Sequence, residues 1–250
     1  MAGRGAGADV PESGIPQDCA SSTPGMLPLV VLGQPEIDRI VASVPGGAAN
    51  VQDIYPLSSL QEGILFHHLL QTTGDAYLMR SLMTFDSRER LDAFLGALQQ
   101  VIDRHDILRT SLRWAGLAQA VQIVHRQATL PVESLAIAPD ADAMEQVRRL
   151  TDTRHLRLDL QQAPLIAAYI APDGSDGRWI LSLVDHHAIS DNVTLRLILA
   201  EIQSLLEGRP DTLPPSLPYR EFIARGLAID PASHEAYFRE VLGDVDETTA

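Results

Sequence analysis

Apolar residues recur with helical spacing in several separate segments of this chain. The clearest stripe lies in residues 88–105 and comprises Leu91, Phe94, Leu95, Leu98, Val101 and Ile102. Positions three and four residues apart share one face of a helix, so this stripe predicts an amphipathic helix. Similar but shorter patterns predict helices over residues 59–71, 142–153, 192–206 and 232–242.

The expected starts and faces of two of these helices follow from particular residues. Ser59 and Glu62 have the spacing of a capping box at the start of the helix over 59–71. Asn192 is the N-cap candidate of the helix over 192–206. One side of that helix carries Val193, Leu197, Ile198, Ile202 and Leu205.

Shorter apolar segments bounded by turn residues predict strands over residues 77–85, 165–171 and 179–184. Residues 108–114 and 118–125 predict a hairpin around Ala115 and Gly116. Helices that alternate with short strands of mixed direction are typical of an α/β sandwich. We therefore expect helices packed against one face of a mixed, mostly antiparallel sheet.

The two ends of the chain differ from its middle. Residues 1–33 are rich in Gly, Ala, Ser, Pro and Asp, which predicts a flexible tail. Pro35 can open a short helix bearing Ile37 and Ile40, so we expect residues 34–50 to form a linker helix. The compact domain is expected over residues 51–220, and residues 221–250 are expected to begin a connection to a second lobe.

Composition narrows the possible functions. The 250 residues include 33 acidic and 19 basic side chains, for a formal net charge of -14. Nucleic acids and anionic membranes bind clustered positive charge, so neither is an expected partner. The chain has one cysteine, Cys19, and its first residues lack the apolar segment of a secretory signal. We therefore expect a cytoplasmic protein.

The segment with the most chemistry is WILSLVDHHAISDNVTL, residues 179–195, in which a buried strand leads into two histidines. Adjacent residues of an extended chain point to opposite sides, so one histidine can face a cavity while the other is packed inside. A neutral imidazole can remove a proton from an amine that attacks a carbonyl. A metal site made of His186, His187 and Asp191 is disfavoured, because adjacent extended residues rarely converge on one ion.

This segment resembles the HHxxxDG motif of nonribosomal peptide synthetase condensation domains and of the related chloramphenicol acetyltransferases. Two further segments match the condensation family in the same order. YPLSSLQEGILF, residues 55–66, resembles the opening motif of that family, and RHDILRT, residues 104–110, resembles its RHExLRT motif. The resemblance implies a chloramphenicol acetyltransferase-like fold, here the N-terminal lobe of a two-lobed condensation domain.

The resemblance also implies roles for individual residues. His187 corresponds to the catalytic histidine and His186 to its structural neighbour. Asp191 corresponds to the motif aspartate, which in the family pairs with an arginine of the RHExLRT segment, and we expect Arg104 rather than Arg109 to be that partner. Asn192 replaces the motif glycine, so the backbone here can depart from the usual turn, although asparagine tolerates a left-handed φ better than most residues.

HHLLQTTGD, residues 67–75, resembles the signature of dual epimerisation and condensation domains. The matching residues are His67, His68, Gly74 and Asp75. By this resemblance the parent enzyme would invert the α-carbon of a carrier-bound aminoacyl thioester before joining it to the next amino acid. His68 also continues the apolar face of its helix and is equally well interpreted as a buried core residue.

The family resemblance implies carrier proteins as partners, each presenting its substrate on 4'-phosphopantetheine, with no cofactor bound covalently by this chain. The channel of a condensation domain lies between two lobes, so we expect the chain alone to have little or no activity. Two alternatives remain open: a trimeric acyltransferase of the chloramphenicol acetyltransferase kind, and a non-catalytic lobe that docks carrier proteins.

Overall fold

The computed structural model describes residues 10–17, 19–138, 140–174 and 176–243. The helices are α1 (Gln34–Ser43), α2 (Ser59–Leu70), α3 (Arg88–Arg104), α4 (Ala143–Leu150), α5 (Asn192–Leu206), α6 (Tyr219–Leu227) and α7 (Pro231–Leu242). The strands are β1 (Val51–Pro56), β2 (Leu78–Phe85), β3 (Thr110–Arg113), β4 (Val121–His125), β5 (Val132–Ser134), β6 (Ile166–Asp173) and β7 (Arg178–His186). The α/β fold with mixed, mostly antiparallel sheets that the sequence predicts is confirmed.

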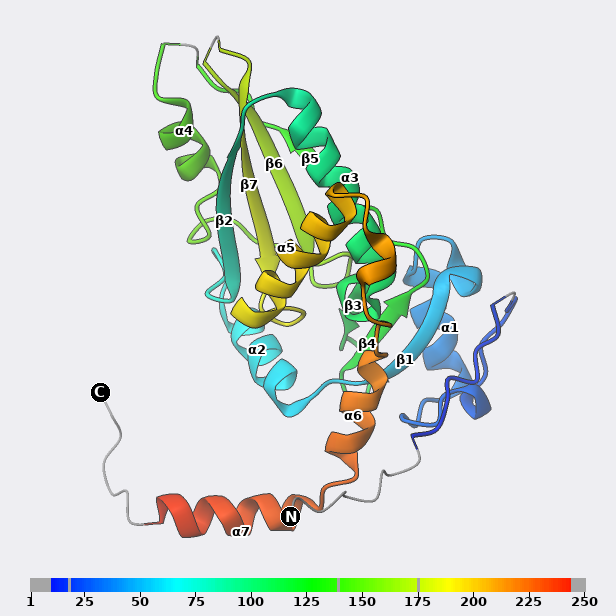
Figure 1. Ribbon diagram of the computed structural model, residues 1–250. Helices are drawn as coiled ribbons and strands as arrows, with labels where there is room; N and C mark the ends of the chain where they lie inside the picture. Colours follow the sequence, from blue (N-terminus) through cyan, green and yellow to red (C-terminus); the bar gives the residue numbers. More distant parts are fainter. Residues whose placement is uncertain (1–9, 18, 139, 175, 244–250) are drawn as a thin grey trace, which may run out of the picture.

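The strands form two sheets (Figure 1). A four-stranded sheet has the order β2-β7-β6-β5, and a three-stranded sheet has the order β1-β4-β3. All neighbouring strands are antiparallel except β5 and β6, which are parallel. The long β7 lies between β2 and β6, so its last residue is held from both sides at the end of the larger sheet.

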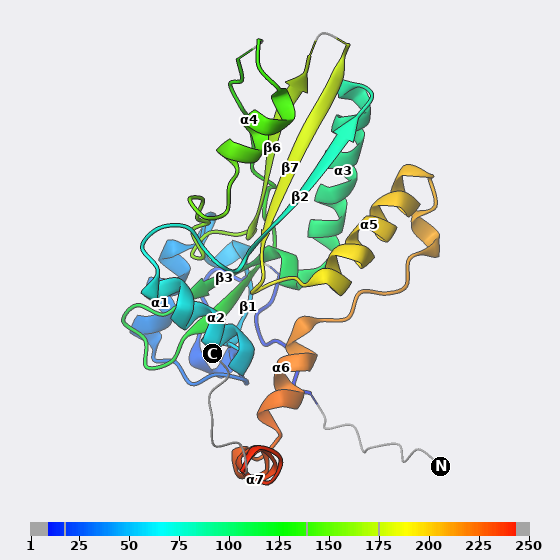
Figure 2. The same cartoon turned by 90° about the vertical axis from the view of Figure 1, so that its left-hand side faces the viewer.

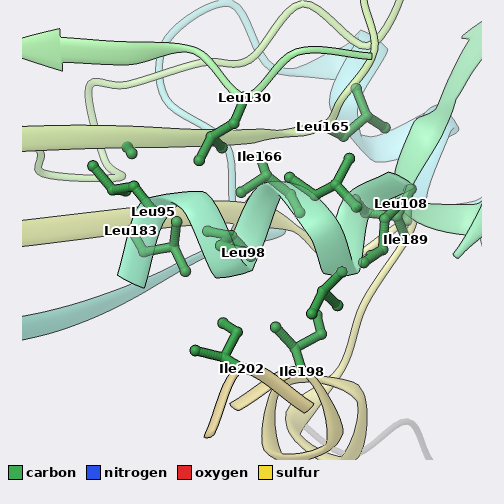
Figure 3. Close-up of a cluster of buried hydrophobic side chains, with 14 of the residues drawn as sticks. Leu95, Leu98, Leu108, Leu130, Leu165, Ile166, Leu183, Ile189, Ile198 and Ile202 are labelled. Carbon is green, nitrogen blue, oxygen red and sulfur yellow. The ribbon is translucent and has the colours of Figure 1, made fainter. Parts of the chain in front are cut away.

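Helices α3 and α5 cover one face of the larger sheet. The predicted stripe of α3 is buried, and Leu98 packs between the sheet residue Leu183 and the α5 residues Ile198 and Ile202 (Figure 3). The side chain of Ser87 caps α3 by accepting a hydrogen bond from the backbone N–H of Arg90. Burial of this apolar stripe is the main force that fixes the helix on the sheet.

Helix α4 covers the opposite face of the same sheet (Figure 2). Val147 packs there on Ala171 of β6 and Ile180 of β7, while their neighbours Ile170 and Leu181 face α3. Because side chains alternate along a strand, both faces of the sheet need apolar cover. The expectation that helices lie on one face only is therefore wrong.

Two helix starts differ from the sequence expectation by one residue. Ser58, not Ser59, caps α2, and its capping-box partner is Gln61, not Glu62. Asp191, not Asn192, caps α5 by accepting from Thr194. In both cases the residue with an extended backbone directly before the helix has the suitable side-chain oxygen, which is the geometry that capping requires.

The buried side of α5 is narrower than its apolar pattern predicts. Ile198 and Ile202 are buried, but Val193 and Leu197 are 64% and 62% exposed. The apolar side predicted for this helix is therefore buried only in part. The first turns of α5 leave apolar side chains facing away from the sheet.

The N-terminal region is packed rather than flexible over the described residues between 10 and 33. Ile15, Cys19 and Leu27 are buried together with Ile37 of α1 and Ile123 of β4. The predicted linker helix forms as α1, but it belongs to this second core and covers the three-stranded sheet. A low apolar content hid the few residues that make these contacts. The first nine residues of the predicted tail lie outside the described residues.

Three elements were not predicted from the sequence: β1, β5 and α6. The side chains of β5 are exposed, and this strand is only three residues long. Helix α6 is anchored by Arg220, whose guanidinium forms a buried ion pair 2.5 Å from the Asp53 carboxylate of β1. That pairing joins residues 167 positions apart, so no local pattern indicates it.

His125, at the end of β4, is a buried histidine outside the candidate motifs. Its Nε2 lies 2.8 Å from Ser111 Oγ. Burial, assisted by the charges of Arg113 and Arg109, lowers the pKa of His125 from 6.5 to about 4. Between pH 6.5 and about 4, His125 therefore binds a proton in the unfolded chain but not in the folded chain. The free energy of unfolding is thus highest above pH 6.5 and decreases as the pH falls toward 4.

We expect His125→Gln to remove this pH dependence. The shift in the pKa of His125 corresponds to roughly 3 kcal/mol of unfolding free energy. Urea unfolding of wild type and variant across that pH range should give a difference that changes by about this amount. The exposed His155→Gln is the matched control. A wild-type-to-His125→Gln difference that stays constant with pH would contradict this prediction.

Among the described residues, no helix is long and apolar enough to cross a membrane.

Candidate active site

The two histidines of the HHxxxDG-like segment lie where β7 ends. His186 is fully buried, while His187 is partly exposed. One histidine is thus packed inside, as alternation along a strand predicts, and the other is partly exposed. The backbone N–H of His187 donates to the carbonyl of Tyr77, at a distance of 2.8 Å, which ties the end of β7 to the start of β2.

The imidazole of His187 is oriented by a single backbone contact. Its Nδ1 lies 2.7 Å from the carbonyl oxygen of Ser190. A carbonyl oxygen only accepts hydrogen bonds, so Nδ1 carries the proton in this contact. In the neutral ring Nε2 then has a free lone pair, which is what a general base needs.

His186 is committed to a buried network. Its Nδ1 accepts from the backbone N–H of Ala188 at 3.1 Å, so its Nε2 carries the proton and donates to Asp75 Oδ2 at 3.2 Å. The same oxygen lies 2.5 Å from Nδ1 of His68. All three residues are buried, so His186 has a structural place beside His187.

Asp75 is the centre of this network. Its Oδ1 accepts from the backbone N–H of Tyr77 at 2.9 Å, while Oδ2 accepts from both histidines. Burial favours the protonated carboxyl, but the hydrogen bonds from His186 and His68 outweigh it and hold the pKa of Asp75 well below its usual range. Asp75 is therefore a buried carboxylate that links the two predicted motifs.

The residues of the predicted epimerisation signature have different surroundings. Gly74 has a φ of +64°, and a Cβ at this position would lie 2.1 Å from the carbonyl oxygen of Arg154, so only glycine fits. His68 is buried, as its alternative interpretation as a core residue predicts. His67 is exposed, and its ring lies 5.9 Å from the ring of Tyr77.

Asp191 does not pair with Arg104 in the described residues. Its Oδ1 accepts from the backbone N–H and the hydroxyl of Thr194, at 2.7 and 2.8 Å. These hydrogen bonds lower the pKa of Asp191. The expected ion pair is thus replaced by a helix cap, which fixes the start of α5 next to the loop that carries His187.

The arginines of the RHDILRT segment serve the packing of the fold. Arg104 lies 3.1 Å from Glu201 of α5. Arg109 is buried and donates to the carbonyls of Ile102 and His125. Both side chains are bound to groups other than Asp191, so the choice of Arg104 as the partner of Asp191 is wrong.

Asn192 is the first residue of α5 rather than part of a left-handed turn. Among the described residues, every residue with a positive φ is a glycine. The backbone at the position of the motif glycine is therefore not left-handed, so the tolerance of asparagine for that conformation is not used here. Asp191 has an extended backbone, with φ of -140°, and the helix follows it directly.

Gln61, inside the YPLSSLQEGILF segment, has a role that no local sequence pattern indicates. Its buried amide donates to the carbonyl of Ala188, the residue after His187, at 3.0 Å. It also exchanges two hydrogen bonds with the amide of Gln122 on β4, at 3.2 and 3.0 Å. Gln61 thus ties α2 and the three-stranded sheet to the loop that carries His187.

We expect Gln61→Ala to lower the free energy of unfolding by about 2 kcal/mol, because the buried groups of Gln122 and Ala188 lose their partners. Chemical denaturation measures this change. Gln100→Ala, which truncates an exposed glutamine on α3, is the control and should change stability far less. Equal effects of the two substitutions would show that the buried amide pair contributes nothing.

Asp185 and Ser190 were also not singled out by the sequence. Ser190 donates a short hydrogen bond to Asp185 Oδ2, and its carbonyl accepts from His187. Burial raises the pKa of Asp185, while the hydrogen bond from Ser190 opposes this. Asp185 therefore fixes the loop between β7 and α5 through its hydrogen bond with Ser190.

Among the described residues, one cluster has ligand atoms close enough together to hold a metal ion. It comprises His68, Asp75 and His186, whose ligand atoms all lie within 4.8 Å of one another. This set differs from the disfavoured trio of His186, His187 and Asp191. The hydrogen bonds explain the cluster without an ion, since both ring protons point at Asp75 Oδ2. The remaining ring nitrogens accept from Arg157 and from Ala188.

Comparison with known sequences gives a consistent result. The sequence model of the condensation-domain family matches residues 51–249 of this chain. The chain is 49% identical over 239 residues to malpinin synthetase from Mortierella alpina. The aligned region covers 95% of this chain and 3% of that protein. The chain is 42% identical over 250 residues to malpibaldin synthetase from the same organism, covering 96% of this chain and 4% of that protein.

Solved structures with the same fold include condensation domains. The starter condensation domain of rhizomide synthetase matches with a TM-score of 0.59 and 22% identity, over 78% of this chain and 49% of that chain. A mutant of that domain in complex with C8-CoA and Leu-SNAC matches with a TM-score of 0.61 and 19% identity, over 78% of this chain and 46% of that chain. The chain thus spans about half the length of these structures.

Proposed function

Because the chain belongs to the condensation-domain family, we propose that it supplies the catalytic lobe for peptide-bond formation between two carrier-bound aminoacyl or peptidyl thioesters. The observation that carries this proposal is the state of His187: a partly exposed imidazole whose Nδ1 proton is held by Ser190, leaving Nε2 free. The family match and the relatives named as synthetases support the substrate class.

In the proposed reaction, the amine of the acceptor attacks the thioester carbonyl of the donor. His187 Nε2 accepts the proton that the amine loses as the C–N bond forms. The C–S bond then breaks, and the proton passes from His187 to the departing thiolate. The products are an amide on the acceptor carrier and a free thiol on the donor carrier. In this scheme, the pantetheine arms belong to the carrier proteins.

We place His187 on one wall of a channel that a second lobe completes, in the same polypeptide or in another. Positioning of two thioesters and exclusion of water supply much of the acceleration in such reactions. Support comes from the matched condensation-domain structures, of which this chain covers about half. The chain on its own should therefore transfer little or no acyl group.

The test is a transfer assay with purified donor and acceptor carrier proteins, followed by intact-protein mass spectrometry. The polypeptide isolated from producing cells with an antibody against residues 50–220 should add the donor acyl mass to the acceptor carrier. No transfer by that polypeptide would overturn the proposal. A stable trimer that acylates a free small molecule would favour the chloramphenicol acetyltransferase alternative, and carrier binding without transfer would favour the docking alternative.

A second proposed activity is epimerisation of the donor. It is supported by the position of the HHLLQTTGD segment, whose Asp75 contacts His186 and whose exposed His67 lies beside Tyr77. Deuterium uptake at the α-carbon of a carrier-bound L-aminoacyl thioester in heavy water tests it. We expect His67→Ala to slow this exchange. Exchange at the uncatalysed rate in wild type would overturn the second proposal and leave the first intact.

A further inference from the structure

Arg157 lies in the segment between α4 and β6 and reaches into the turn after α2. One of its terminal nitrogens, Nη1, donates to the carbonyls of Gln71 and Gly74, at 2.9 and 2.8 Å. The other, Nη2, lies 2.9 Å from the carbonyl of His68 and 2.8 Å from His68 Nε2. A single planar guanidinium thus contacts two carbonyls of the turn and the imidazole of His68.

These contacts determine where His68 carries its proton. A guanidinium only donates, so Nε2 of His68 must accept and Nδ1 must carry the proton. That proton points at Asp75 Oδ2, 2.5 Å away. Burial lowers the pKa of His68, the hydrogen bond to Asp75 raises it, and the charge of Arg157 lowers it further.

The charges of Asp75 and Arg157, on opposite sides of the His68 ring, are complementary. Asp75 is a buried carboxylate, and a buried charge is costly unless it is paired and hydrogen-bonded. Arg157 supplies a positive charge on the far side of the neutral His68 ring. The ring therefore connects the carboxylate to the guanidinium and is fully used by these two contacts, so it is not free to act as an acid or base.

The same turn places the catalytic histidine. Asp75 accepts from the backbone N–H of Tyr77, and the carbonyl of Tyr77 accepts from the backbone N–H of His187. Asp75 also accepts from His186, the residue before it. A shift of the turn would therefore move both the backbone and the neighbour of His187.

We propose that Arg157 is a positioning residue that fixes the proton of His68 on Nδ1 and holds the turn over residues 71–77, and through it His187. The inference rests on the proposed function only for the role of His187. The HHLLQTTGD segment then contributes to the site through a buried scaffold of His68, Gly74 and Asp75, with His67 as its exposed histidine.

Nuclear magnetic resonance of the 15N-labelled chain tests the scaffold without any activity. Long-range proton–nitrogen spectra report which ring nitrogen of each histidine carries a proton, and His68→Gln identifies the signals of His68. We expect wild-type His68 to be a single neutral form with its proton on Nδ1. In Arg157→Met, which has no donor, we expect this single form to be lost and His68 to titrate at higher pH.

Arg154→Met is the matched control, because Arg154 lies three residues away and pairs with Asp152 at the surface. It should leave the His68 signals unchanged. Arg157→Lys restores one donor and should recover the Nδ1-protonated form. A folded Arg157→Met with wild-type His68 signals would overturn the proposal. If Arg157→Met does not fold, the wild-type spectra still test the proposal. A proton found on Nε2 of His68 would overturn it, because that nitrogen could not then accept from Arg157.

The effect on His187 is measured separately in the transfer assay. We expect Arg157→Met to lower kcat by roughly 10- to 100-fold with little change in KM, because the base is displaced while the substrate-binding surface is retained. An unchanged kcat would refute the positioning of His187. Absence of transfer in wild type would instead count against the proposed function, and the His68 spectra would still test the scaffold.

Discussion

Replacement of His187 by alanine is expected to lower the rate of acyl transfer by at least about 100-fold, the usual contribution of a positioned general base. The fold should be retained, because the His187 side chain is partly exposed and makes one hydrogen bond, to Ser190. Single-turnover transfer between carrier proteins by the native polypeptide, read by mass spectrometry, measures the rate. Far-UV circular dichroism and the midpoint of thermal unfolding establish that the variant is folded.

The exposed His155→Ala is the matched control and should transfer at the wild-type rate. A His187→Ala variant that is folded and transfers within a factor of about three of wild type would exclude general-base catalysis by this residue, since even a modest base contributes far more. Catalysis by positioning alone would then be the better explanation.

Replacement of Asp75 by asparagine is expected to lower the free energy of unfolding by about 3 kcal/mol, the cost of breaking a buried charged network. The amide replaces one acceptor oxygen by an NH2 donor at a place where His68, His186 and the backbone N–H of Tyr77 all donate. Urea unfolding measures the change. Asp103→Asn removes an exposed carboxylate of α3 and should alter stability by less than about 0.5 kcal/mol.

The effect of Asp75→Asn should also depend on pH. Because the pKa of folded Asp75 lies below its ordinary value of 3.8, its carboxylate stabilises the fold fully above that pH. The contribution is lost as the pH falls toward the lower folded value. The gap in stability between wild type and Asp75→Asn should therefore narrow below pH 3.8, and a gap that widens there would contradict the assignment of Asp75 as the buried carboxylate.

Local patterns predicted the regular elements well. The stripe over residues 88–105 became α3, and the hairpin around Ala115 and Gly116 became β3 and β4, because side-chain period and turn residues act over short distances. Elements held by distant partners were missed. Helix α6 depends on Arg220 reaching Asp53, and the N-terminal region depends on a few apolar residues meeting α1 and β4.

In the candidate site, too, local features could be predicted from the sequence and contacts between distant residues could not. The sequence placed His186 and His187 at the end of a buried strand and indicated that one of them is packed inside, because alternation along a strand is local. The family resemblance, not the alternation, gave His186 the structural role. It could not show that Asp75 lies 3.2 Å from His186, since these residues are 111 positions apart. The assignment of Arg104 to Asp191 was wrong because helix capping by Asp191 and the ion pair with Glu201 satisfy the two groups separately.

The role of Arg157 had no signal in the sequence. It is one of many arginines, all the basic residues of this chain being arginine, and no motif surrounds it. Arg157 and His68 are 89 positions apart, so no local pattern joins them. Only the three-dimensional arrangement identifies which arginine contacts His68.

The most direct test of His187 as the general base is a structure of the native polypeptide with a non-reactive aminoacyl-pantetheine analogue in the acceptor position. We expect the amine nitrogen of the analogue to lie within hydrogen-bonding distance of His187 Nε2, about 3 Å. We also expect His187 Nδ1 still to donate to Ser190 and Asp75 still to join His68 to His186. An amine that lies out of reach of His187 and contacts another base would contradict the central claim.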